Sequence, residues 1–122
     1  MQSEALPGGI GEPGVPPSSA ALCKQIMRGA GLDFSNAYTL AVMLSECDSV
    51  FLLVAAVNRG GEVTPDGFRR GLEELRQSFL PTLTYRSRFS ATQHDGASAI
   101  RDYVYDDPCG CFRFPDSKLY AI

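Results

Sequence analysis

The sequence is short of the residues that most catalytic centres need. His94 is the only histidine among 122 residues, and the Asp95-Gly96 pair that follows predicts an exposed turn. No serine lies in a nucleophile elbow, so an acyl-transfer triad has little support. Gly8-Gly9 and Gly60-Gly61 match neither pattern of a phosphate-binding loop. We therefore expect a protein that is not an enzyme, with no catalytic residue, no metal and no cofactor.

An excess of basic charge is also missing. The chain carries 11 Lys and Arg against 14 Asp and Glu, which gives a net charge of −3. This balance provides no electrostatic basis for binding nucleic acid or an anionic membrane surface. We expect no nucleic-acid partner. The length allows one domain with a modest core.

The beginning of the chain differs in composition from the rest. Residues 1–18 contain four prolines and four glycines, which predicts a linker or an irregular segment. The folded domain is then expected over residues 19–122. Residues 1–20 have no basic n-region and no continuous apolar core, so no signal peptide is predicted within this chain.

The first helix is expected from about Ala20 to Arg28. Ser18 or Ser19 can cap its free amide groups, and Gly29 or Gly31 can end it. Apolar residues recur along one face at helical spacing, so that face should be buried. They are Leu22, Cys23, Ile26, Met27 and Ala30.

The second and longest helix is expected from Ala37 to Arg59, with Ser35 or Asn36 as its cap and Gly60-Gly61 as its stop. It is almost wholly apolar, but polar residues interrupt its middle and make a membrane-spanning position costly. These are Ser45, Glu46, Asp48 and Ser49. We expect this helix to be buried between a sheet and a neighbouring helix.

A third helix should begin at Thr64-Pro65, with the threonine as N-cap and the proline in the first helical position. Phe68, Leu72 and Leu75 form its single apolar stripe.

After Pro81 the apolar period changes to two, which predicts strands. The first strand places Leu83, Tyr85 and Phe89 on one side and Thr84, Arg86 and Arg88 on the other. Residues 99–105 read as a second strand, residues 106–108 as a turn, and Cys111 to Phe114 as a third short strand.

The order of these elements predicts the fold class. Three helices followed by a short hairpin or meander indicate an α+β unit if the chain stands alone. Such a short sheet would have exposed edges unless further strands pair with it.

Four cysteines are an even number, which favours disulfides formed in an oxidising compartment. Cys23 and Cys47 lie on the apolar faces of successive helices, and a helix crossing could join them, at a gain of roughly 3 kcal/mol in stability. Cys109 and Cys111 would be about 6.5–7 Å apart in a regular strand, at the limit for a disulfide, unless the chain bends at Gly110. We favour the Cys23–Cys47 pair; the other two connectivities stay unranked.

Cys109 and Cys111 also allow two sharper hypotheses. They could form a redox pair, or together with His94 contribute to a zinc site. Zinc needs about four ligands, and here a fourth is hard to supply. Redox pairs usually lie at a helix N-terminus, whereas these cysteines follow a turn into a strand. A structural disulfide is the favoured interpretation.

Several segments together carry a resemblance to a known family. Cys47-Asp48 opens an apolar run that continues through Ala55-Ala56 to Gly60-Gly61, and a second helix follows at Thr64 to Leu75. Thr82 to Ser90, His94-Asp95-Gly96 and Tyr103 to Phe114 then follow in order, and Pro13 to Met27 precedes them all. In order and spacing the chain resembles the carboxyl-terminal part of solute-binding proteins of bacterial ABC importers, of the leucine/isoleucine/valine type.

The resemblance implies an α/β fold, part of the second lobe of a type I periplasmic-binding fold that closes on its ligand by a hinge. It implies an extracytoplasmic protein, periplasmic or at the cell surface, that delivers branched-chain or similar amino acids to a membrane permease without inserting into the membrane. The amino acid would bind only together with the missing lobe, so no ligand-binding residue is carried over. We expect the rest of the longer protein, with its signal peptide, to lie upstream.

A second function hypothesis comes from the cysteines alone. A small thiol-dependent redox enzyme would use Cys109 and Cys111 as its reacting groups. Reactive thiols in the native protein would favour this alternative.

Overall fold

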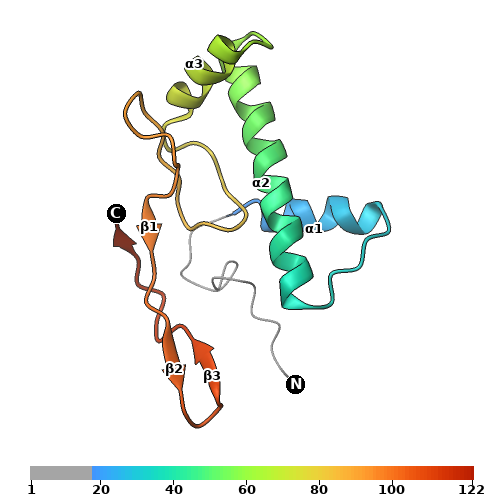
Figure 1. Cartoon of the computed structure of the whole chain (residues 1–122), viewed down its shortest axis with the longest axis vertical. Coiled ribbons are helices and arrows are strands. Elements are labelled where there is room, and N and C mark those ends of the chain that lie inside the picture. The colour runs from blue at the N-terminus through green and yellow to red at the C-terminus, as the bar shows by residue number, and fades with distance from the viewer. Residues whose placement is uncertain (1–17) are drawn as a thin grey trace.

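The computed structural model describes residues 18–122 (Figure 1). Nearly all of the linker predicted over residues 1–18 therefore lies outside the described residues. The described part is a small mixed α/β structure in which three helices precede four short strands. This arrangement agrees with the predicted order of helices and strands.

Helix α1, Ala20–Gly29, begins and ends close to the predicted positions. The Ser18 hydroxyl accepts a hydrogen bond from the Ala20 N–H, at 3.2 Å. Ser19 has a different role from the predicted cap. Its N–H donates to the Pro81 carbonyl and its hydroxyl to the Leu80 carbonyl, so it joins the start of α1 to a distant segment.

Helix α2, Ala37–Gly60, is bounded by the local signals that the sequence predicts. The Asn36 side chain accepts from the Thr39 N–H at 2.8 Å and so caps the first turn. At the other end Gly61 adopts a left-handed conformation with φ of 74°, and its N–H donates to the Val57 carbonyl. Such a C-cap favours glycine because it has no Cβ.

Helix α3, Pro65–Leu75, follows after a short turn. The Thr64 hydroxyl accepts from the Gly67 N–H at 3.0 Å, and Pro65 occupies the first helical position, as predicted. The helix ends before Arg76, which has a positive φ of 49°.

Glycines allow α2 and α3 to approach each other closely. A Cβ at Gly71 would overlap the Ala56 carbonyl, and a Cβ at Gly60 would overlap the Gly67 carbonyl. The two helices therefore pack backbone against backbone. A buried cluster seals this contact, consisting of Ala56, Leu72, Leu75 and Phe89.

A second cluster lies where α1 crosses α2 (Figure 1). Its buried members come from both helices: Ala20, Cys23, Leu40, Leu44 and Cys47. The apolar stripe predicted for α1 is only partly used, because Leu22 and Ile26 remain about half exposed, at 51% and 49%.

The first predicted strand, with its alternation from Leu83 to Phe89, is wrong. This part of the chain contains only two isolated bridges, Ser87 with Ala97 and Ser90 with Gln93. Its backbone runs beside the helices, where the Phe89 N–H donates to the Arg76 carbonyl. The predicted alternation of side chains does occur around Ser87, but the pairing is too short to make a strand: the Arg88 N–H donates to the Gly96 carbonyl and the Ser98 N–H to the Arg86 carbonyl, and the pairing goes no further.

The remaining strands form a two-part ribbon. Strand β1, Ala99–Ile100, pairs antiparallel with β4, Tyr120–Ala121. Strand β2, Val104–Asp106, pairs antiparallel with β3, Cys111–Arg113. The strand predicted over residues 99–105 is thus divided, and β4 was not predicted.

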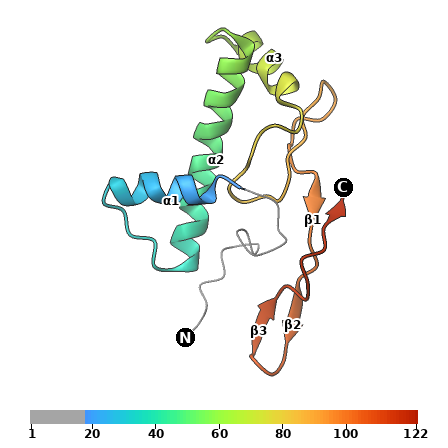
Figure 2. The ribbon, with the colours of Figure 1, turned by 180° about the vertical axis from the view of Figure 1, so that it is seen from behind.

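The ribbon projects away from the helices, and its tip is far from α2 in both views (Figure 2). The expectation that α2 packs against a sheet is therefore wrong for residues 18–122. Arg101 lies in the gap between β1 and β2, and its Nε donates to the Asp116 carbonyl. This hydrogen bond joins the two sides of the ribbon between the β1–β4 pair and the β2–β3 pair.

The helix contact at Gly71 predicts a difference between two glycine-to-alanine substitutions. Gly71→Ala should lower the free energy of unfolding by about 2 kcal/mol, because the new Cβ must push α3 away from the backbone of α2. Gly29→Ala is the matched control, since no atom lies within 4 Å of its added Cβ. Urea denaturation followed by circular dichroism measures both. Equal effects of the two substitutions would contradict the close packing.

Candidate functional site

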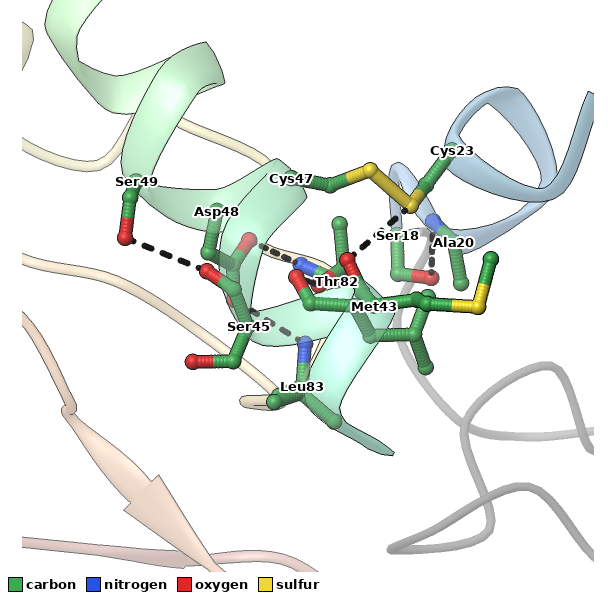
Figure 3. Close-up of a disulfide and its surroundings, with 11 residues drawn as sticks. Ser18, Ala20, Cys23, Met43, Ser45, Cys47, Asp48, Ser49, Thr82 and Leu83 are labelled. Atoms are coloured by element: carbon green, nitrogen blue, oxygen red, sulfur yellow. Dashed lines mark hydrogen bonds between the residues drawn. A yellow bond between two sulfur atoms is a disulfide. The ribbon is translucent and has the colours of Figure 1, made fainter. Parts of the chain in front are cut away.

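The middle of α2 is bound to two other parts of the chain, α1 and the segment at Thr82 (Figure 3). The Asp48 carboxylate accepts hydrogen bonds from the Thr82 N–H at 2.6 Å and from the Leu83 N–H at 3.2 Å. The fully buried Thr82 hydroxyl donates to the Leu44 carbonyl at 2.7 Å. The backbone after α3 is thereby bound to α2 through groups 34–38 residues away in the sequence.

The disulfide between Cys23 and Cys47 lies next to the Asp48 carboxylate (Figure 3). It is the pair that the sequence favoured, with Cα atoms 5.9 Å apart and both residues buried. Because Asp48 follows Cys47 directly, one turn of α2 holds both α1 and the segment at Thr82. We name Cys23, Cys47, Asp48 and Thr82 the α2 junction.

The tip of the ribbon carries the second cysteine pair. Cys109 and Cys111 are bonded to each other, and both are exposed. Gly110 between them has a φ of +60° and brings their Cα atoms to 5.2 Å, closer than a regular strand allows. Beside the tip, the Arg113 Nε forms an ion pair with the Asp106 carboxylate.

One face of the ribbon is lined with aromatic rings. Tyr105 lies opposite Phe112, so the alternate neighbours Tyr103 and Phe114 point to the same side. The Tyr103 ring is 5.1 Å from that of Phe112 and 5.0 Å from that of Phe114, and Tyr105 is 5.2 Å from Phe112. The Arg101 guanidinium lies over the Phe114 ring at 4.3 Å. We call these four rings the aromatic face.

His94 is exposed in the loop before Gly96. Among residues 18–122, no group of three or more histidine, cysteine or acidic residues is placed to hold a metal ion. The zinc site considered from Cys109, Cys111 and His94 is therefore not assembled in this structure. A hollow of about 350 Å³ lies between residues 77–88 and the end of the chain, but we assign no ligand contact to it.

Sequence reasoning missed two features that the structure brings together. It treated Asp48 only as an interruption of an apolar helix, and nothing local to Asp48 identifies the Thr82 and Leu83 N–H groups as its partners. It used the alternation of Tyr103, Tyr105, Phe112 and Phe114 only to predict strands. The same alternation could have identified the aromatic face.

No known protein family, curated protein or solved structure matches the chain. The functional proposal therefore rests on the residues and their geometry.

The α2 junction predicts that Asp48 stabilises the fold. Asp48→Ala should reduce the free energy of unfolding by about 2 kcal/mol, because the Thr82 and Leu83 N–H groups lose their acceptor. Glu46→Ala, at an exposed acidic residue of the same helix, is the control and should change it by less than about 0.5 kcal/mol. Urea denaturation compares the two variants. A destabilisation by Glu46→Ala as large as that by Asp48→Ala would contradict the role of the junction.

The two disulfides should differ in their effect on stability. Replacing both Cys23 and Cys47 by alanine should cost about 3 kcal/mol, because the bond closes a long loop and fixes α1 on α2. Replacing Cys109 and Cys111 by serine should cost about 1.5 kcal/mol or less, since the bond closes a very short loop at an exposed tip. Thermal and urea unfolding of the two double variants tests this order. A larger loss from the tip pair would be inconsistent with it.

Proposed function

We propose that the chain is the carboxyl-terminal part of an extracytoplasmic solute-binding protein, which delivers branched-chain or similar amino acids to an ABC importer. It would form the outer helices and the terminal hairpin of the second lobe of a type I periplasmic-binding fold. Its role would be mechanical and not enzymatic. The ligand would be held between this lobe and another, and closure about a hinge would trap it.

The observation that carries this proposal is the apolar surface that the chain leaves uncovered. On α2, Val50, Leu53 and Val54 are 56%, 53% and 52% exposed. Leu22 and Ile26 of α1 are exposed in the same way, and so are three rings of the aromatic face, Tyr103, Tyr105 and Phe112. Exposed large apolar side chains gathered on one element mark contacts with another part of a protein or with a partner. A second lobe and the rest of this one would supply such a cover.

The ribbon supports the same proposal. Two-stranded sheets are marginally stable alone, and the strands of this ribbon contain only two or three residues each. Each pair leaves both of its outer edges unpaired among the described residues. Further strands of a lobe would pair with these edges.

The properties of α2 also bear on the predicted absence of membrane insertion. Its length and composition alone would let it cross a membrane. Asp48, however, binds the backbone of Thr82 and Leu83, and Cys47 is bonded to α1. A helix with such partners has its polar groups satisfied within a folded protein, which supports a receptor outside the membrane.

The two disulfides support an extracytoplasmic location. Such bonds form and persist in oxidising compartments and are rare in the cytosol. Within the proposed receptor, the α2 junction would make α1, α2 and the segment at Thr82 move as one rigid body. Rigid lobes are what hinge closure requires, because a soft lobe would absorb the movement.

Amino-acid binding by the longest product of the reading frame tests the proposal. This product, secreted into an oxidising compartment, should bind leucine, isoleucine or valine in equilibrium dialysis, whereas the 122-residue chain alone should not. Small-angle X-ray scattering should show a smaller radius of gyration when the ligand is bound, because the lobes close. Glucose is a control ligand that should have neither effect.

Two results would overturn the proposal. One is a reading frame in which no further domain precedes these residues. The other is a longer product that binds no amino acid even at millimolar concentrations.

A further inference from the structure

We propose that the Cys109–Cys111 disulfide is a thiol-exchange site at the ribbon tip, which small dithiols reduce while Cys23–Cys47 stays oxidised. This inference does not depend on the receptor assignment, because it rests on the different surroundings of the two disulfides. It also differs from the thiol-enzyme hypothesis, since the tip itself is the substrate and no turnover is required.

The two disulfides differ in how accessible their sulfur atoms are to a reductant. Exchange requires an attacking thiolate to approach a disulfide sulfur along the S–S axis. Cys23 and Cys47 are only 1% and 4% exposed, inside the cluster between α1 and α2. Cys109 and Cys111 are both exposed, on a turn that projects away from the helices (Figure 2). A reductant can therefore reach the tip without any opening of the fold, whereas the buried pair reacts only after local unfolding.

The chain around the tip explains why a dithiol is the suitable reductant. Gly110 and the turn over residues 107–110 hold Cys109 and Cys111 with Cα atoms 5.2 Å apart. After attack by a monothiol, the released cysteine stays close to the mixed disulfide and tends to expel the reductant again. A dithiol competes with this reversal because its own second thiol is equally close.

The chemical step is a two-electron exchange. A thiolate of the dithiol attacks one cysteine sulfur, the Cys109–Cys111 bond breaks, and the other cysteine leaves as a thiolate that takes a proton from water. The second thiol of the reductant, deprotonated by solvent, then attacks the mixed disulfide. The products are two protein thiols and the oxidised, cyclic reductant.

Reduction of the Cys109–Cys111 bond should change the packing of the rings in the aromatic face. Cys111 lies directly before Phe112, and Asp106, its partner in the β-pairing, directly follows Tyr105. The disulfide therefore closes the turn beside the Tyr105–Phe112 ring contact. Because the chain has no tryptophan, the near-ultraviolet circular dichroism comes mainly from tyrosine and from the disulfides themselves, and two of its five tyrosines lie on this face.

The experiment treats the folded chain with 1 mM dithiothreitol at pH 8, quenches samples with iodoacetamide and maps the modified cysteines by mass spectrometry. We expect carbamidomethyl groups on Cys109 and Cys111 to appear at least about 50-fold faster than on Cys23 and Cys47. The far-ultraviolet helix signal should remain while the near-ultraviolet tyrosine signal falls. Cys109→Ser/Cys111→Ser is the matched control, which should gain no modified cysteine until denaturant is added.

Four results would overturn the inference. The two disulfides could react at equal rates, the buried pair could react first, or the tip could stay oxidised at this dithiol concentration. A control variant that acquires modified Cys23 and Cys47 as fast as the tip reacts in the parent chain would overturn it too. Loss of tyrosine signal in the control at the same rate as in the parent would remove the link to the aromatic face.

Discussion

The fold depends on the pair of hydrogen bonds from the backbone of residues 82 and 83 to the Asp48 carboxylate. After α3 the chain has no regular structure until β1, so its course must be fixed by contacts made elsewhere. Asp48 fixes it from α2, and Ser19 fixes it from the start of α1 through the Leu80 and Pro81 carbonyls. The Cys23–Cys47 bond holds these two helices together at the same level. The chain after residue 83, which includes the ribbon, therefore leaves the helices from a position that these contacts set.

Local signals in the sequence were sufficient for the helices. The Asn36 cap, the Gly61 stop and the Thr64-Pro65 start each act within a few residues of themselves, so reading them needs no knowledge of the tertiary fold. The strand predicted from the alternation between Leu83 and Phe89 failed for the opposite reason. A period of two reports that side chains alternate between buried and exposed positions, and it does not report which backbone groups are available to pair. Around Ser87 the alternation is real, but the backbone pairs with residues 96–98 over a single bridge only.

The short strands of the ribbon and the long-range contact of the α2 junction could not be predicted from local sequence patterns. Strands of two residues, such as β1 and β4, are too short to produce a pattern, and their pairing of Ala99 with Ala121 is set by the return of the chain end. Asp48 and Thr82 are far apart in sequence, and neither residue indicates its partner. For the cysteines, by contrast, the apolar faces of successive helices limited the choice. Hence one long-range contact, Cys23 with Cys47, was within reach of sequence reasoning while the neighbouring one was not.

The exposed apolar surface is not a sign of poor internal packing. Among residues 18–122, every buried side-chain nitrogen or oxygen has a hydrogen-bond partner. A chain that had failed to find its own packing would leave both polar and apolar groups unsatisfied. Here only apolar groups such as Val50, Val54 and Phe112 remain uncovered, and they lie on helix and ribbon faces with regular backbone. Apolar groups exposed on faces of regular backbone are typical of surfaces that contact another part of a protein or a partner, and the proposed receptor would supply such a contact for both the helices and the ribbon.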